Sequence, residues 1–207
     1  MGSRIEEFQD NYEKSSEIVV TIDGPSGAGK GTLAEFIADE LGIECYSAGD
    51  FFRQIAKEKD LTVEELSEKA DKETDIKVDK RTLEKGLSEN CLIESRIASW
   101  VLGDYSDLSI YLKADIDERA KRIYSDLEEE ERTGEQEASN LDEAIEKVEK
   151  RDKDDKERYR EYYGIDIGNI QDYDLVINNT NLSIERQNEL VKSELKKRFP
   201  ERFDEEA

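Results

Sequence analysis

Short apolar runs alternate along the chain with longer segments whose apolar residues recur at helical spacing. Residues 17–22 form a β-branched apolar run, which predicts a strand, and a glycine-rich turn follows it. After the turn, one helix face is marked by Leu33, Phe36, Ile37 and Leu41. Four more short apolar runs follow, at residues 43–46, 91–94, 108–112 and 175–177. This alternation predicts a three-layer α/β fold, with a five-stranded parallel sheet and helices on both faces.

Two connections between the predicted strands are too long for simple crossovers. The connection between the second and third strands has helical patterns near residues 50–58, 62–72 and 75–87. Between the fourth and fifth strands, residues 128–139 predict a mobile tip flanked by two helices, and a last helix is expected at 183–199. Ligands bind at the carboxyl edge of such sheets, so both insertions are expected to project from that edge.

These patterns predict one folded domain over residues 17–199, a size that suffices for a substantial core. Its first insertion is expected at about residues 50–88 and its second at about 117–160. Residues 1–16 are interpreted as a polar N-terminal tail, and residues 200–207 as an acidic C-terminal tail.

The charge balance is strongly acidic. The chain carries 54 acidic and 31 basic residues, a formal net charge of −23, yet its apolar runs persist. That combination favours a folded protein with an acidic coat over a disordered chain. Such a coat repels phosphate backbones, so no nucleic-acid partner is expected, and a phosphate-bearing substrate would need a locally basic pocket.

Several classes of site and location are disfavoured by composition. The chain has no histidine, which removes histidine-based triads and the usual zinc sites. Its two cysteines, Cys45 and Cys91, lie in apolar runs and are interpreted as buried, reduced thiols. No apolar stretch approaches the ~20 residues of a membrane span, and residues 1–16 do not resemble a signal peptide. We therefore expect a cytoplasmic protein without a membrane partner.

One motif, between the first predicted strand and helix, indicates phosphate binding. It reads Gly24-Pro25-Ser26-Gly27-Ala28-Gly29-Lys30-Gly31-Thr32 and matches G-x-x-x-x-G-K, with a hydroxyl one place later than usual. The glycines let main-chain N–H groups turn toward one point, and Lys30 adds a full charge for the β and γ phosphates of a nucleotide. The alternative, a turn that merely connects strand and helix, is disfavoured by this flanking context.

Arginines recur near the expected ligand edge. In the second insertion, an apolar helix face ends in Arg151, Asp155 and Arg158, as expected for a helix that reaches over a nucleotide. Arg119 and Arg122 lie one turn apart on the helix that enters this insertion. The alternative for both sets is a series of solvated surface ion pairs. Two further arginines, Arg53 and Arg96, follow predicted strands, where guanidinium groups suit an acceptor phosphate.

Four segments together resemble nucleoside monophosphate kinases, and cytidylate kinases of the archaeal type in particular. The first is the P-loop, and the second is Ser47-Ala48-Gly49-Asp50-Phe51-Phe52-Arg53, which resembles the monophosphate-holding loop. The third is Ile93-Glu94-Ser95-Arg96, and the fourth is the run from Arg151 to Arg158, which fits R-D-x-x-D-x-x-R. The likeness covers residues 17–199. It implies a P-loop NTPase fold in which the first insertion binds the monophosphate and the second forms a lid.

The resemblance also implies the reaction and its residues. ATP with Mg²⁺ would donate a phosphate to CMP, and also to dCMP. The P-loop from Gly24 to Thr32 would bind ATP, with Thr32 and Glu94 near Mg²⁺, Glu94 through water; alternatively, Glu94 pairs with Arg96. The acceptor would be bound by Ser47, Arg53, Arg96, Arg151, Asp155 and Arg158, with Asp155 at the ribose. The catalytic charges would be those of Lys30, Arg119, Arg122, Arg151 and Arg158.

Two other functions stay open at the sequence level. One is an adenylate kinase-like or other small-molecule P-loop kinase, because the segment from Ser47 to Arg53 fits either family. The other is a nucleotide-hydrolysing switch or assembly factor, in which the full set of arginines would have no role. We expect a monomeric enzyme.

Overall fold

A computed structural model describes residues 2–9, 12–61, 66, 72–128 and 138–203 of the chain. Its centre is a five-stranded parallel sheet with strand order β2-β3-β1-β4-β5. The strands are β1 (Val19–Asp23), β2 (Glu44–Ser47), β3 (Cys91–Ser95), β4 (Leu108–Lys113) and β5 (Leu175–Asn178). The predicted five-stranded parallel sheet is confirmed, and each strand begins within two residues of its predicted apolar run.

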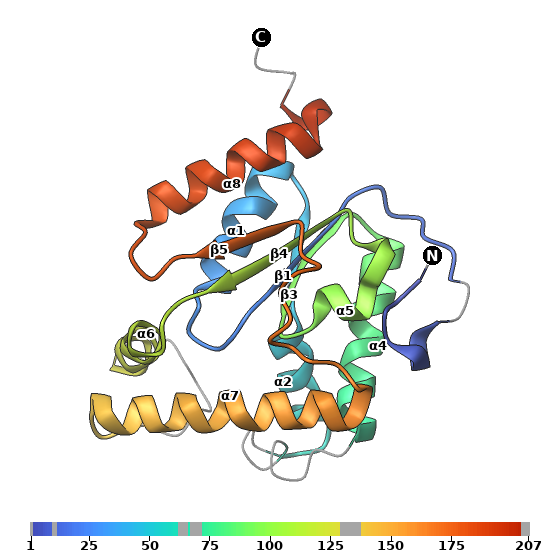
Figure 1. Ribbon diagram of the computed structural model, residues 1–207. Coiled ribbons are helices and arrows are strands. Elements are labelled where there is room, and N and C mark those ends of the chain that lie inside the picture. Colours follow the sequence, from blue (N-terminus) through green and yellow to red (C-terminus); the bar gives the residue numbers. More distant parts are fainter. Residues whose placement is uncertain (1, 10–11, 62–65, 67–71, 129–137, 204–207) are drawn as a thin grey trace.

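Helices cover both faces of the sheet (Figure 1). On one face lie α1 (Lys30–Leu41) and α8 (Ile184–Arg198), and on the other lie α4 (Lys72–Ser88) and α5 (Ala98–Leu102). The other α-helices with described bounds are α2 (Ala48–Glu58), α6 (Ile116–Glu128) and α7 (Leu141–Tyr163). Short 3₁₀ helices span Glu6–Phe8, Gly103–Tyr105 and Pro200–Arg202.

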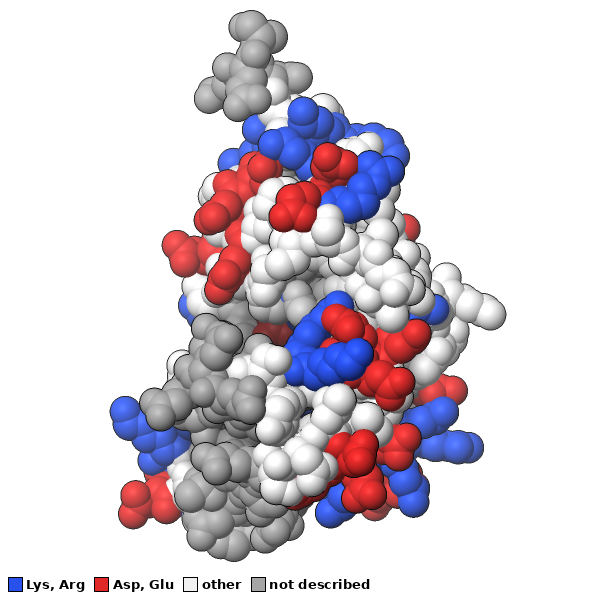
Figure 2. Space-filling model, turned by 90° about the vertical axis from the view of Figure 1, so that its left-hand side faces the viewer, with Lys and Arg blue, Asp and Glu red and all other residues white. Residues whose placement is uncertain are grey.

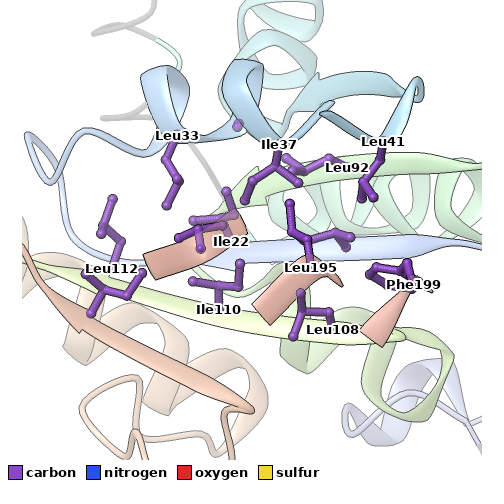
Figure 3. Close-up of a cluster of buried hydrophobic side chains, with 14 of the residues drawn as sticks. Ile22, Leu33, Ile37, Leu41, Leu92, Leu108, Ile110, Leu112, Leu195 and Phe199 are labelled. Atoms are coloured by element: carbon purple, nitrogen blue, oxygen red, sulfur yellow. The ribbon is translucent and has the colours of Figure 1, made fainter. Parts of the chain in front are cut away.

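The sheet is buried on both faces because successive strand residues point to opposite layers. Val20 and Ile22 of β1 join the cluster under α1 and α8, whereas Val19 joins the cluster under α4 and α5. Figure 3 shows the first of these clusters. Side chains of α1 lie against β3 and β4 there, and Leu195 of α8 and Phe199, the residue that follows α8, complete the layer.

Local signals explain where the helices begin and end. The α1 helix ends at Gly42, whose left-handed conformation suits glycine. The Asn140 side chain accepts a hydrogen bond from the Glu143 N–H and starts α7, which ends at the left-handed Gly164. The helix expected at 183–199 is α8, with Ser183 as its N-cap.

The two insertions are partly described. The first contains α2 and α4, as predicted, while most of the predicted helix 62–72 lies outside the described residues. The second contains α6 and α7, and residues 129–137 of the predicted tip lie outside the described residues. None of the helices that the structure describes is both long and apolar enough to cross a membrane.

Three expectations at the edges of the domain are wrong. The N-terminal segment is not a free polar tail, because Ile5 and Phe8 are fully buried against α4 and α5. At the other end, residues 200–202 form a 3₁₀ helix and Phe203 packs on the core, so the domain extends past residue 199. Cys45 is exposed because β2 is an edge strand; Cys91 is buried, and both thiols are free.

Candidate active site

The candidate site lies at the carboxyl edge of the sheet, where β1 is flanked by β3 and β4. The P-loop leaves β1 at Gly24, and Arg96 follows β3 directly. In Figure 1 the long α7 helix runs across this end of the domain with α6 beside its first turns. Residues far apart in the sequence therefore meet around the P-loop, as the sequence predicted for this edge.

The P-loop needs glycine at defined positions. Gly24, Gly27 and Gly29 all have positive φ angles, of 153°, 72° and 86°. A Cβ atom on Gly27 would lie 2.6 Å from the main-chain oxygen of Arg119 on α6. Gly27 therefore serves two purposes, because it permits the turn and lets α6 approach the loop closely.

Basic side chains bind the main-chain carbonyls of the P-loop. The pairs are Arg96 with Gly24 at 3.1 Å, Lys30 with Pro25 at 3.1 Å, Arg119 with Ser26 at 3.1 Å and Arg122 with Ala28 at 3.3 Å. Three of these four donors come from outside the loop, from the residue after β3 and from α6. The loop is thus surrounded by cationic groups, which supply the locally basic pocket that an acidic protein needs for a phosphate ligand.

Lys30 is buried at the first position of α1. Burial and the nearby charge of Arg96 together lower its pKa to about 7, against the attraction of Glu94. Its Nζ lies 3.9 Å from the Glu94 carboxylate, at the edge of ion-pair distance. An anionic ligand in the loop would restore the full charge of this amine.

Glu94 does not pair with Arg96, which was one of the two interpretations from the sequence. Its carboxylate instead accepts a 2.5 Å hydrogen bond from the Ser47 hydroxyl and faces Lys30. Thr32 is exposed in the first turn of α1. Hydroxyl and carboxylate oxygens are hard donors that suit Mg²⁺, which protein sites commonly hold together with substrate phosphates and water. Among the described residues there is no cluster of three acidic, histidine or cysteine side chains that would form a protein-only metal cage.

Arg96 instead pairs with Asp155 of α7, at 2.7 Å. Asp155 is buried, and although burial favours its neutral form, Arg96 and Arg158 hold its pKa below the usual value. Arg158 donates to Asp155 at 2.8 Å and lies 3.4 Å from Asp75 of α4. The α7 helix is therefore connected both to the end of β3 and to the first insertion.

A second contact joins the same two helices. Tyr163 of α7 donates a 2.5 Å hydrogen bond to Asp79 of α4, and burial raises the pKa of Asp79 to about 7. Sequence reasoning missed Asp75 and Asp79. The available signal was their i, i+4 spacing with Val78 between them and Leu83 beyond, which places two carboxylates on the buried face of α4.

Of the remaining predicted arginines, two contact the P-loop and two are exposed to solvent. Arg119 is buried and pairs with Asp152 at 2.6 Å, while Arg122 contacts Glu118 and Asn179 near the loop. Arg151 is exposed, but its charge is close enough to act on Lys30. Arg53 is exposed at the start of the first insertion and pairs with Asp50.

A cavity of about 190 Å³ opens between the P-loop and α7. Its lining contains two predicted acceptor residues, Arg96 and Asp155, as well as Asp152 of α7. The other lining residues are Gly24, Pro25, Tyr111, Lys156, Ile167 and Gly168, most of which the sequence gave no reason to select. A cavity with paired charges at its wall suits a polar, phosphate-bearing ligand.

The outer surface carries interspersed charges. Figure 2 shows acidic and basic side chains on the face that lies to the left in Figure 1, with basic groups gathered at the top of the molecule. That end is the last turn of α8, where Lys196, Lys197 and Arg198 follow one another. Cationic groups at a helix C-terminus complement the helix dipole, so this gathering needs no ligand.

Comparisons with known proteins identify the family of this chain. Residues 20–87 match the model of the family described as cytidylate kinase, and residues 71–181 match the cytidylate kinase-like family. The cytidylate kinase of Staphylothermus marinus is 36% identical over 182 residues, which are 87% of this chain and 97% of the relative. That of Halorubrum lacusprofundi is 37% identical over 172 residues, 82% of this chain and 84% of the relative.

Solved structures show the same fold at low identity. A shikimate kinase from Bacteroides thetaiotaomicron superposes with a TM-score of 0.57 at 16% identity, covering 87% of this chain and 97% of that structure. An uncharacterized protein from Eubacterium ventriosum gives a TM-score of 0.62 at 20% identity, over 87% and 99%. These two establish the fold alone, whereas the sequence relatives and family models reach across both insertions and the P-loop. The chain belongs to the cytidylate kinase family.

Proposed function

We propose that the protein transfers the γ-phosphate of MgATP to CMP, and also to dCMP, to form the nucleoside diphosphate and ADP. An oxygen of the acceptor phosphate attacks the γ-phosphorus, a new P–O bond forms, and the bond to the bridging oxygen of ADP breaks. The observation that carries the proposal is the meeting of the P-loop with Arg96 and Asp155 around one cavity, with Arg158 paired to Asp155. The acceptor phosphate is already an anion, so no histidine base is needed.

The donor would bind in the P-loop, with its β and γ phosphates beside Lys30. The Lys30 amine is buried, and its pKa of about 7 leaves it partly neutral without a ligand. A nearby anion would stabilise its charged form, which favours a triphosphate at this point. Thr32 and Glu94 are proposed to orient Mg²⁺ and its waters. Bound there with the phosphates, the ion would reduce the charge on the transferred group.

The acceptor would lie on the side of Arg96 and the cavity. Arg53 and Arg96 are proposed to bind its phosphate, with Ser47 nearby, and Asp155 to accept a hydrogen bond from a sugar hydroxyl. Asp155 is suited to this because its lowered pKa keeps it an acceptor at neutral pH. Arg53 would have to exchange its Asp50 partner for the phosphate, which its exposed position permits.

Charge on the transferred group would be neutralised by Arg122, Arg151 and Arg158 together with Lys30. Arg122 reaches the P-loop from α6, and Arg158 lies on α7, where it pairs with Asp155 one turn away. Arg119 was predicted for the same role from the family resemblance. The helices of the two insertions flank this space, so their approach would exclude water and limit ATP hydrolysis.

The competing functions are less well supported. An adenylate kinase-like activity would leave the R-D-x-x-D-x-x-R run without its purpose, and the relatives are named cytidylate kinases. In a switch that only hydrolyses a nucleotide, Arg96, Asp155 and Arg158 would have no acceptor to bind. We also propose a monomer that acts in the cytoplasm without nucleic-acid partners, which the acidic charge and the two free thiols support.

The test is ADP formation from MgATP with CMP, dCMP, UMP, AMP or no acceptor. CMP and dCMP should drive turnover. Lys30→Ala and Arg158→Ala should each reduce it at least about a hundredfold, whereas the control Lys153→Ala, an exposed residue of α7, should not. Equal ADP formation without any acceptor would favour the hydrolysing switch. Preference for AMP would favour the adenylate kinase-like alternative.

A further inference from the structure

We propose that Asp152 and Arg119 form a positioning pair that orients the P-loop for ATP, so that Arg119 acts on the loop and not on the transferred phosphate. Asp152 was not among the residues selected from the sequence. The pair joins the two lid helices, α6 and α7, to the main chain of the donor site.

Most of the Arg119 guanidinium is occupied by protein groups. Its Nε donates to the Ala114 carbonyl at 3.1 Å, and its Nη1 donates to the Ser26 carbonyl at 3.1 Å. Nη1 and Nη2 also donate to the two oxygens of Asp152, at 3.2 and 2.6 Å. Four of the five N–H donors of the guanidinium therefore have partners inside the protein. With 5% of its surface exposed, the side chain has little freedom to reach a phosphate.

The bond to Ser26 has a consequence for the loop. A peptide group is planar and trans, so its C=O and N–H point in opposite directions. Arg119 draws the Ser26 carbonyl outward, which turns the Gly27 N–H of the same peptide away from Arg119. Main-chain N–H groups turned inward in this way are what a P-loop presents to phosphate.

Packing reinforces the same orientation. The backbone of Arg119 lies so close to Gly27 that no side chain fits between them, and Ile123 of α6 contacts the same point. The loop therefore rests on α6, and a hydrogen bond from the same helix sets the direction of its peptide.

Asp152 acts through Arg119. Its two oxygens accept from both terminal nitrogens, a bidentate arrangement that fixes the plane of a guanidinium. Without this carboxylate, Arg119 would be a buried cation lacking its ion-pair partner, and the bond to Ser26 would weaken. Because Asp152 belongs to α7, the position of the lid is transmitted to the donor site.

The experiment measures nucleotide binding and turnover separately. Affinities of a non-hydrolysable MgATP analogue and of CMP are determined by calorimetry, each without the other ligand, for wild type and Asp152→Asn. The matched control is Asp154→Asn, the same change at an exposed position of the same helix. Arg119→Lys keeps the positive charge but cannot bind the Ser26 carbonyl and both Asp152 oxygens at once. This variant also tests the pair if Asp152→Asn does not fold. The double variant completes a cycle.

We expect Asp152→Asn and Arg119→Lys each to weaken analogue binding about tenfold, the scale of one charged hydrogen bond. In Arg119→Lys, whose side chain does not line the cavity, CMP affinity should change less than about twofold. Asp154→Asn should change neither affinity, and the double variant should lose no more analogue affinity than Arg119→Lys alone. Unchanged analogue affinity, equal losses for both ligands in Arg119→Lys, or additive losses in the double variant would each overturn the proposal. So would a fall in kcat with unchanged analogue affinity in Arg119→Lys, because it would put Arg119 on the transferred group.

This inference rests on the proposed function only in taking MgATP as the ligand of the P-loop. The two fail differently. If CMP does not stimulate ADP formation, the proposed function falls while the analogue affinities still decide the role of Asp152. If CMP turnover is normal and the affinities do not move, only the positioning pair falls.

Discussion

The Arg96 guanidinium and the Asp155 carboxylate lie 2.7 Å apart and join the end of β3 to the middle of α7. Both side chains are largely withdrawn from water. Removing one partner should therefore cost more than removing both, since a buried charge would be left without its main counterion. Arg96→Ala is expected to lower the free energy of unfolding by about 3 kcal/mol, and adding Asp155→Asn should recover part of it. Denaturant titration of the two variants measures this; a double variant less stable than Arg96→Ala would contradict it.

Two P-loop glycines provide a matched comparison. A Cβ on Gly27 would collide with the backbone of α6 at a φ of 72°, whereas no atom lies within 4 Å of a Cβ on Gly31. Gly27→Ala should weaken MgATP binding at least about tenfold, because the strain and the collision would shift the loop. Gly31→Ala should bind nearly as wild type. Calorimetric affinities test this, and similar values for the two variants would be evidence against the close approach of α6.

Lys30 should take up a proton when MgATP binds at mildly alkaline pH. Its pKa of about 7 in the free protein leaves it mostly neutral at pH 8, and bound phosphates favour the charged form. Calorimetry in buffers of different ionisation enthalpy should show uptake approaching ~1 proton at pH 8 and little at pH 6. Affinity should correspondingly fall as the pH rises above 7. The Lys30→Arg variant stays charged and should show no uptake from this position; equal uptake in both proteins would assign the proton elsewhere.

Asp79 should make stability depend on pH. Its pKa is raised by burial from 3.8 to about 7, so the folded state binds more protons than the unfolded state between these values. Stability from this group is thus lost as the pH rises from about 4 to about 7. Asp79→Asn, which can still accept from Tyr163, should be more stable than wild type at pH 8, by roughly 2 kcal/mol, and the gain should shrink toward pH 5. A gain independent of pH would show that Asp79 is not the titrating group.

The N-terminal segment should contribute to stability through Phe8. This side chain is completely buried, whereas Tyr12 is 38% exposed. Phe8→Ala is expected to lower the free energy of unfolding by about 3 kcal/mol, because it removes a buried ring and leaves a cavity. Tyr12→Ala is the control and should cost much less. Equal costs, measured by denaturant titration, would mean that the segment does not pack on the core in solution.

Local sequence patterns were sufficient to predict most of the strands and helices of this protein and its P-loop. The five strands, the long helices and the P-loop follow from hydrophobic period and glycine placement, which depend on neighbours within a few residues. Gly27 is an example, since the turn itself requires a residue that tolerates a positive φ. The arginines that we propose for the acceptor side were also selected from the sequence, through their motif and their places after strands.

The partners of the charged groups were decided only by the tertiary structure. Arg96 could pair locally with Glu94, yet it meets Asp155, 59 positions away, because β3 ends beneath α7. Asp152 and Asp75 gain their roles in the same way, and Phe8 is buried by α4 and α5 although it lies in a polar segment. Periodicity determines which face of an element is apolar, but which charged groups form pairs depends on their distance in space. That distance is set only when the insertions pack against the sheet.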